Sequence, residues 1–304
     1  MMSACRVCLA PVDGGAYHRA CSLELFDAPT PPTIEVEVAK LHTLALAMVG
    51  HTSISGVQKK ISLRLDSERN TLQVATSGAR YIFKPQAQTF PHLPENEHVT
   101  MRMAKLVGLE VPPCGLVQLA DGSLAYLVRR FDRTATAKLA LEDFCQLAEK
   151  SPKDKYEGSA ELCFKLVARF ASEPGIEKAK LLRLFMFTWW TGNGDMHLKN
   201  LSLLTRDGRH VLSPVYDLLC TRLVIAGDPL SLSIVGKKDK LGPSAWRALA
   251  EYAGVPAKAF ARIAAAFTSA LGPAEQLVGR SFLPAGMRED YIALLRERVG
   301  SFVG

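Results

Sequence analysis

The chain has 304 residues, 48% of them hydrophobic, which is enough to bury a sizeable core and to form two lobes with a small appendage. Its formal charge of +7 allows binding to polyanions, but the basic residues lie in short, scattered clusters that are typical of a solvated surface. The longest apolar stretch, 181–190, contains Arg183 and is too short to span a bilayer. Residues 1–8 lack the apolar segment of a secretory signal. We therefore expect a soluble, cytoplasmic protein that does not bind membranes.

Near the N-terminus, three cysteines and a histidine have the spacing of a metal site: Cys5, Cys8, His18 and Cys21. A Cys3His set closes a tetrahedral zinc site without an open position, so the ion would be structural. In so short a segment, zinc would be nearly the only available source of folding energy. The alternative is a disordered tail that bears cysteines. The other four cysteines are scattered singly, which indicates reduced thiols and not disulfides.

Residues 26–128 have the pattern of a mixed lobe. A proline-rich stretch, 28–32, predicts a linker, because proline neither propagates a helix nor donates to a sheet. Beyond it, short alternating strands such as 61–65 accompany one helix. Apolar residues recur at helical spacing over 95–107, and this helix should end before Gly108.

The segment 52–60, before strand 61–65, is rich in small residues. Ser53, Ser55 and Gly56 would let backbone N–H groups approach the oxygens of a phosphate. By itself the segment is weak evidence, because an ordinary polar turn has the same composition.

Lys84 ends a run with strand character, 81–84, where its ammonium could reach a phosphate. A carboxylate on the following helix could pair with this lysine and fix its rotamer. Glu97, thirteen positions further on, and Glu95 both satisfy this requirement, and the sequence leaves the choice open.

The most informative stretch is 194–200, which sets Asp195 five positions before Asn200, directly after an apolar helix. This order is typical of the catalytic loop of a phosphotransferase, in which the aspartate orients the substrate hydroxyl and the asparagine holds magnesium. A metal-binding carboxylate should then follow on the next short strand pair. Asp217 does so, after a turn at an Asp-Gly pair. Carboxylate and amide oxygens suit magnesium, so ATP and Mg²⁺ are the predicted cofactors.

From residue 129 to 304 the chain is predicted to be mainly helical. Helical patterning extends over 181–190, 244–253, 257–271 and 287–302.

Together these residues resemble the HipA-type serine/threonine toxin kinases of bacterial toxin–antitoxin systems. The Ser-Ile-Ser loop at 53–55 and the short N-terminal region look more like the compact HipT branch. The matching stretches are, in order, 53–58, 83–85, 96–97, 104–112, 130–133, 142–146, 194–200 and 214–217. The resemblance implies an α+β, two-lobed protein-kinase-like fold of the HipA C-terminal type. It also implies an aminoacyl-tRNA synthetase as the phosphorylated target, and an antitoxin that links the kinase to DNA. The expected division is a zinc knuckle over 1–25, a mixed β N-lobe over 26–128 and a helical C-lobe over 129–304.

The resemblance also assigns roles to single residues. Lys84 corresponds to the ATP-binding lysine, Asp195 to the catalytic aspartate, and Asn200 and Asp217 to the magnesium ligands. Within the loop, His197 is left between two roles, because it could orient the backbone or touch a phosphate.

Two further stretches follow from the same resemblance. Arg130, Phe131 and Asp132 fall where adenine and ribose would be held, although a plain strand and a salt-bridged turn would have the same pattern. Ser53 and Ser55 match the region that the family autophosphorylates.

Two other functions remain open at this point. The loop form Gly-Asp-x-His-x-x-Asn also resembles that of small-molecule and lipid kinases. An inactive kinase-fold binding module is the second alternative, and the intact set of Lys84, Asp195, Asn200 and Asp217 argues against it.

Overall fold

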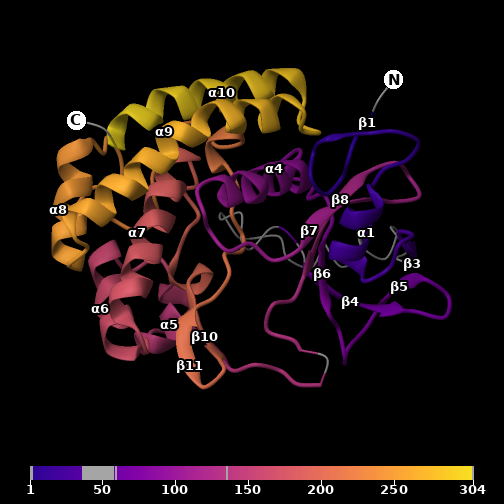
Figure 1. Ribbon diagram of the computed structural model, residues 1–304, viewed down its shortest axis with the longest axis horizontal. Coiled ribbons are helices and arrows are strands. Elements are labelled where there is room, and N and C mark those ends of the chain that lie inside the picture. The colour runs from indigo at the N-terminus through magenta and orange to yellow at the C-terminus, as the bar shows by residue number, and fades with distance from the viewer. Residues whose placement is uncertain (1–2, 36–57, 59, 135, 303–304) are drawn as a thin grey trace.

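The structure, a computed structural model, describes residues 3–35, 58, 60–134 and 136–302, which form two lobes (Figure 1). One lobe is built on a sheet and the other mainly on helices. The strands described are β1 (Ser3–Ala4), β2 (Pro11–Val12), β3 (Thr33–Glu35), β4 (Ile61–Asp66), β5 (Thr71–Val74), β6 (Tyr81–Lys84), β7 (Cys114–Gln118), β8 (Leu124–Arg129), β9 (Leu141–Asp143), β10 (Ser202–Arg206) and β11 (Arg209–Leu212). The α-helices described are α1 (Arg19–Phe26), α4 (Leu93–Leu106), α5 (Phe144–Leu147), α6 (Ala160–Phe170), α7 (Pro174–Trp190), α8 (Pro243–Ala253), α9 (Ala257–Gly279) and α10 (Ala285–Val299). Short 3-10 turns are η1 (Pro152–Asp154), η2 (Leu198–Asn200), η3 (Thr221–Leu223) and η4 (Gly300–Phe302).

Strand β6, which ends in Lys84, lies inside the six-stranded sheet of the N-terminal lobe. The strand order is β3-β5-β4-β6-β8-β7, antiparallel except between β3 and β5. Lys84 lies opposite Tyr126 on β8. Because successive side chains of a strand point to opposite faces, Ile82 and Lys84 share one face, and Tyr81 and Phe83 share the other.

Helix α4 covers the face of the sheet to which Lys84 belongs. Its residues Val99 and Met103 join Leu116 of β7 in the main hydrophobic core, and all three are fully buried. Burial of each such side chain stabilises the fold by about 1.5–3 kcal/mol. As predicted, the helix ends before Gly108, whose φ of 77° favours glycine.

The N-terminal segment packs on the opposite face of the same sheet. Cys5, Val7 and Phe26 share a second hydrophobic core with strand residues such as Phe83. The described part of this segment, 3–26, therefore uses the sheet to bury its apolar side chains. The predicted division at residues 25 and 128 remains a prediction.

Helix α7 is buried in the C-terminal lobe and leads into the loop 194–200. Phe187 and Trp190 are fully buried, and α7 packs against α6, α8, α9 and α10. The helix begins at Pro174, before the predicted start at Leu181, because proline is well tolerated in the first turn.

The C-terminal lobe contains a three-stranded sheet of order β9-β10-β11. Strands β10 and β11 follow the loop 194–200, whereas β9 precedes it. The hairpin between β10 and β11 turns at Asp207 and Gly208, as predicted. Both residues have positive φ, 51° and 74°, which is the conformation that the tight turn of a two-residue hairpin needs.

The predicted C-terminal helices are present, but the predicted end of the helix at 271 is wrong. Helix α9 continues through Pro273 to Gly279. Beyond the proline, Ala274 and Val278 are fully buried, and this packing outweighs the hydrogen bond that proline removes. No helix in the described ranges is long and apolar enough to cross a membrane.

Candidate functional site

Hydrogen bonds hold the loop 194–200 in a defined shape. The N–H of Asp195 donates to Asn193 Oδ1 at 3.0 Å, and Asn200 Nδ2 donates to the carbonyl of Asp195 at 3.2 Å. Asp195 and Asn200 are 8% and 5% exposed. Because the amide nitrogen of Asn200 is used within the loop, its amide oxygen is the atom that can serve a cation.

Gly194 is required where the loop begins, because there is no space for a side chain. A Cβ at this position would overlap Asp228 Oδ2 and would lie 2.5 Å from the carbonyl oxygen of Pro229. The N–H of Gly194 donates to Thr221 Oγ1 at 2.8 Å, and Thr221 also contacts Asp228. The loop is thus anchored at its start to the segment 221–229.

Tyr156 and His197 support Asp195 from the side. The hydroxyl of Tyr156 donates to Asp195 Oδ1 at 2.7 Å. The rings of Tyr156 and His197 meet edge to face with centroids 5.1 Å apart. Burial, together with the charge of Lys155, lowers the pKa of His197 to about 4, so the imidazole is neutral at physiological pH. A neutral, packed ring favours the interpretation in which His197 orients the loop.

Lys84 lies between two carboxylates. Its Nζ is 2.6 Å from Glu97 Oε1 and also contacts Asp217 Oδ1. The second oxygen of Asp217 accepts from Lys60 Nζ at 2.5 Å. Glu95, the other carboxylate left open by the sequence, pairs instead with a histidine at the start of α4 at 3.2 Å. The structure therefore places Glu97 on the lysine.

The charges of this group stabilise one another. Burial alone would lower the pKa of Lys84, but Asp217 and Glu97 outweigh burial and raise it, so the ammonium stays charged. Burial alone would raise the pKa of Asp217, but Lys60 and Lys84 outweigh burial and hold it well below its usual range. A buried pair of this kind becomes costly when one partner is removed, since the other is left as an uncompensated charge.

Lys84 lies in a cleft of about 270 Å³ between the lobes, and the predicted adenine-site residues line it. Arg130 donates twice to the carboxylate of Asp132, at 2.9 and 2.8 Å. Phe131 packs against Tyr216, with ring centroids 5.7 Å apart. The salt-bridged turn is therefore present, and it borders the cleft.

Tyr216 connects the segment before Asp217 with the end of the loop 194–200. Its hydroxyl lies 3.0 Å from the carbonyl of Lys199, to which it donates, and 2.6 Å from Ser202 Oγ. The position of Asp217 is thereby tied to that of the loop. Asp217 itself has φ 56°, a backbone conformation that is uncommon outside glycine and typical of functional positions.

The donor set fits magnesium bound to a nucleotide. Asp217 offers a carboxylate that stays ionised, and Asn200 offers an amide oxygen, both hard ligands of the kind that Mg²⁺ takes. Lys84 supplies positive charge beside Asp217. These residues could hold a metal-bound triphosphate with its charge largely neutralised.

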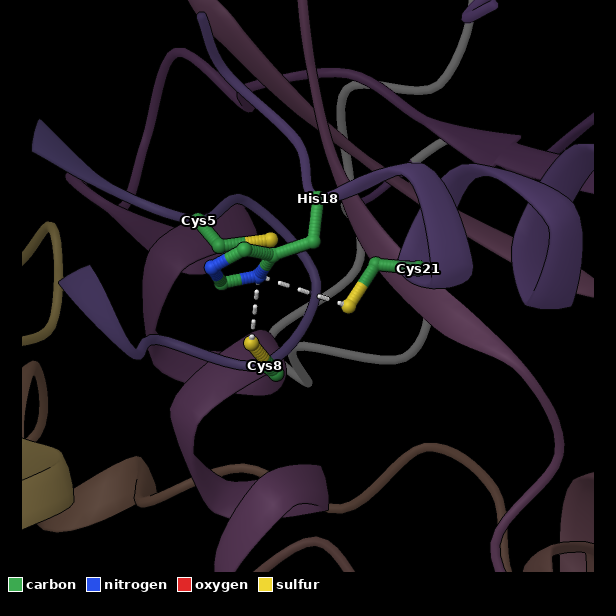
Figure 2. Close-up of side chains that lie close together, drawn as sticks. All are labelled: Cys5, Cys8, His18 and Cys21. Atoms are coloured by element: carbon green, nitrogen blue, oxygen red, sulfur yellow. Dashed lines mark hydrogen bonds between the residues drawn. The ribbon is translucent and has the colours of Figure 1, made fainter. Parts of the chain in front are cut away.

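The four metal-ligating candidates of the N-terminal segment converge (Figure 2). One ligand atom from each of Cys5, Cys8, His18 and Cys21 lies within 4.8 Å of the others. His18 Nδ1 is 3.3 Å from Cys8 Sγ and 3.8 Å from Cys21 Sγ. Tetrahedral zinc with bonds of about 2.3 Å to sulfur and about 2.0 Å to nitrogen would set these pairs about 3.5 Å apart.

Hydrogen bonds with neighbouring residues favour the metal-binding forms of His18 and Cys5. His18 Nε2 lies 2.9 Å from the carbonyl of Pro11, which can only accept, so Nε2 carries the proton and Nδ1 faces the sulfurs. Burial alone would raise the pKa of Cys5, but N–H groups that include those of Cys8 and Val7 donate to the thiolate and lower it to about 7. None of the seven cysteines, all of them among the described residues, forms a disulfide. The sequence predicts this for the four that are scattered singly.

The predicted site residues Ser53, Ser55 and Gly56 lie outside the described residues.

The structure adds residues that the sequence did not single out. Lys60, to which no role was assigned, contacts Asp217, although its place beside the small-residue segment was a usable signal. Tyr156 belongs to no motif, and only its packing reveals its contact with the loop.

The family model of the HipA-like C-terminal domain matches residues 52–274. The chain belongs to this family. Among curated relatives, the Sinorhizobium fredii protein named "Putative kinase Y4mE" is 34% identical over 215 residues, which are 67% of this chain and 51% of the relative. The "Serine/threonine-protein kinase toxin HipA" of Shewanella oneidensis is 29% identical over 188 residues, 55% of this chain and 42% of the relative. The chain spans about half the length of the curated relatives that it matches.

Solved structures confirm the predicted two-lobed α+β fold of this HipA-like chain. HipA of S. oneidensis MR-1, in a complex with HipB and operator DNA, superposes with a TM-score of 0.74 at 22% identity and covers 88% of this chain and 71% of that one. The Helicobacter pylori proinflammatory kinase CtkA gives a TM-score of 0.56 at 16% identity, over 76% of this chain and 87% of that one.

Proposed function

We propose that this chain is an ATP-dependent serine/threonine protein kinase that acts in the cytoplasm as the toxin of a toxin–antitoxin system. The observation that carries the proposal is the buried Lys84 between Glu97 and Asp217, three residues that line one cleft. A strand lysine paired with a helix carboxylate and placed beside a metal-binding aspartate is the arrangement that phosphoryl transfer from ATP needs. The name of the S. oneidensis HipA relative supports the toxin role.

In this proposal each side chain positions or neutralises charge. Lys84 binds the α- and β-phosphates with its rotamer fixed by Glu97, and Asp217 and Asn200 present oxygens to magnesium. Bound magnesium neutralises charge on the phosphate oxygens. Asp195 accepts a hydrogen bond from the substrate hydroxyl and turns it toward the phosphate, which contributes typically 10²- to 10⁴-fold to such reactions.

The cleft residues Arg130, Phe131 and Asp132 are proposed to hold the adenosine part of ATP. The double hydrogen bond from Arg130 fixes the carboxylate of Asp132, and Phe131 offers an aromatic ring beside Tyr216. Because Asp132 is only 5% exposed and already bonded to arginine, it shapes the wall of the cleft more than it changes the charge there.

The finer parts of the proposal rest on the resemblance to HipA-type kinases. We propose an aminoacyl-tRNA synthetase as the substrate, and an antitoxin through which the kinase is held on DNA. The complex of S. oneidensis HipA with HipB and operator DNA supports such an antitoxin partner. Ser53 and Ser55 are the proposed autophosphorylation sites. A phosphate there adds roughly −1.5 to −2 charges beside the phosphates of ATP, so it should weaken nucleotide binding.

Incubation of the protein with bacterial lysate and radiolabelled ATP tests the function. Wild-type protein should label a band of synthetase size, and an Asp195→Ala variant should not. Label in a small molecule would instead assign a small-molecule kinase, and no label would indicate an inactive binding module. Mass spectrometry of the labelled band identifies the substrate, and a Ser53→Ala, Ser55→Ala double variant shows whether the protein modifies its own loop.

A further inference from the structure

The loop between Cys5 and Cys8 is bonded to both elements that flank it in the N-terminal lobe. The carbonyl of Arg6 accepts from the N–H of Leu116 on β7 at 2.8 Å, so the loop adds to the edge of the sheet. The carbonyl of Val7 accepts from Nε2 of His98 on α4 at 2.9 Å. Both bonded carbonyls belong to residues that lie between two metal-ligating candidates.

The loop between Cys5 and Cys8 is tightly packed, and its contact with α4 is buried from solvent. Val7 and His98 are each 1% exposed. A Cβ on Gly115 of β7 would lie 2.9 Å from the Arg6 carbonyl oxygen and from Val7 Cγ2, so only glycine allows the loop to approach so closely. Leu9, just beyond Cys8, is fully buried in the core that α4 shares. The loop therefore wraps the edge of the sheet and contacts the helix on its far side.

His98 directly follows Glu97, the residue that holds Lys84. The same stretch of α4 thus carries the contact with the cysteine loop and the ion pair that a nucleotide needs. In kinases the position of this helix controls whether the lysine–glutamate pair forms.

We propose that the Cys5, Cys8, His18 and Cys21 cluster binds one zinc ion, and that the zinc-ordered loop positions helix α4 and thereby the Lys84–Glu97 ion pair. The metal then acts on nucleotide binding through a loop that never touches the nucleotide. This inference deepens the proposed function and rests on it for its nucleotide measurement, whereas zinc content and the mobility of α4 are independent of it. His98 is a positioning residue in this scheme.

The coupling predicts three measurable changes when zinc is removed with a chelator or by Cys8→Ala. Zinc content should fall from one equivalent to none. Amide hydrogen exchange should accelerate in α4 and at Leu116 of β7, whose N–H donates to the loop, while strands β4, β5, β6 and β8 stay protected. ATP affinity should fall about tenfold, the scale of one buried hydrogen bond and its packing. Re-addition of zinc to the chelated wild type should restore both the slow hydrogen exchange of α4 and the affinity for ATP. Cys163→Ala, which removes a buried thiol remote from the cluster, is the matched control and should change none of these quantities.

Substitutions of His98 separate the link from the metal. His98→Leu should keep one zinc ion, yet accelerate hydrogen exchange in α4 and weaken ATP binding. His98→Gln can donate to the Val7 carbonyl, so its exchange in α4 and its ATP affinity should match those of the wild type. In the double variant Cys8→Ala, His98→Leu the losses should not add, because both changes break one connection.

The outcome of these measurements decides the proposal. It is overturned if protein purified without chelator holds no zinc, if zinc-free protein shows unchanged exchange in α4, or if α4 and the whole sheet lose protection together. If wild-type protein binds no ATP, the proposed kinase function fails, while exchange in α4 still tests the coupling.

Discussion

Lys60 Nζ lies 2.5 Å from Asp217 Oδ2, while Lys84 contacts the other oxygen of the same carboxylate. The two lysines differ in exposure, because the side chain of Lys60 is 46% exposed and that of Lys84 only 4%. The proposed magnesium ligand is therefore held by one buried and one displaceable cation. Binding of a metal at Asp217 has to compete with Lys60.

This competition predicts the effect of Lys60→Gln. Without the competing ammonium, the magnesium concentration for half-maximal ATP binding should fall by about two- to fivefold, because exposed ion pairs are worth about 0.2–1 kcal/mol. A titration of Mg²⁺ at fixed ATP measures this. Lys258→Gln, an exposed lysine on α9, is the matched control. An unchanged or higher magnesium requirement would show that Lys60 serves the nucleotide and does not compete for Asp217.

Tyr156→Phe should lower the rate of phosphoryl transfer and leave ATP affinity unchanged. The tyrosine hydroxyl is 2.7 Å from Asp195 Oδ1, and a hydrogen bond to a charged group is worth about 1.5–3 kcal/mol. We expect kcat to fall by about 10- to 100-fold, while Asp195→Asn should cost roughly 10³-fold or more. Steady-state kinetics separate the two quantities. A raised KM for ATP with unchanged kcat would place Tyr156 in nucleotide binding instead.

The sequence predicted those residues whose role depends on short spacing. Asp195 and Asn200 lie in one loop, and Asp217 follows the next hairpin, so a local pattern carries the chemistry. The choice between Glu95 and Glu97 could not be made, because both lie at the start of one helix and only its docking on the sheet decides which faces Lys84.

Long-range contacts lay beyond the sequence pattern. Tyr156 is 39 positions before Asp195 and reaches it only because the segment after α5 packs beneath the loop. Helix α9 continues past Pro273, because Ala274 and Val278 beyond it are buried. The cysteine loop likewise approaches the sheet edge only because residue 115 is glycine, and nothing in the sequence around Gly115 predicts this contact.

His98 predicts a dependence of stability on pH. Burial, the largest effect, and the nearby Arg102 lower its pKa from 6.5 to about 4, although the bond to Val7 opposes them. A histidine that is neutral when folded contributes stability above pH 6.5, and that contribution is lost as pH falls from 6.5 to 4, because the unfolded chain then binds the extra proton. The contribution is on the order of 3 kcal/mol at most.

The comparison with His98→Gln isolates this effect. Chemical denaturation at about pH 8, 6 and 5 measures the free energy of unfolding of both proteins. The value for wild-type protein should fall relative to that of the variant as the pH falls. Equal pH slopes for the two proteins would contradict a neutral, buried His98.

Gly194→Ala should displace the loop 194–200 and lower activity by steric overlap alone. The φ of Gly194 is not positive, so the requirement for glycine comes from the Asp228 carboxylate, which a Cβ would overlap, and from the Pro229 carbonyl oxygen, 2.5 Å from where that Cβ would lie. The side-chain oxygen can move but the backbone carbonyl cannot do so cheaply, so the loop itself must shift. A displacement of about 1 Å at Asp195 can cost roughly 10²-fold in rate, and overpacking typically costs about 1–3 kcal/mol of stability.

A second substitution tests whether space is the cause. Adding Asp228→Ala removes the nearer clash and leaves the Pro229 carbonyl in place, so it should restore only part of the activity that Gly194→Ala removes. Gly272→Ala on α9 is the control, because a Cβ there meets nothing within 4 Å and alanine favours a helix. It should leave phosphoryl transfer unchanged and keep or raise the melting temperature. Full activity in Gly194→Ala would mean that the loop tolerates the shift, and that the position of Asp195 is set by Tyr156 and Asn193 rather than by its anchor at Thr221.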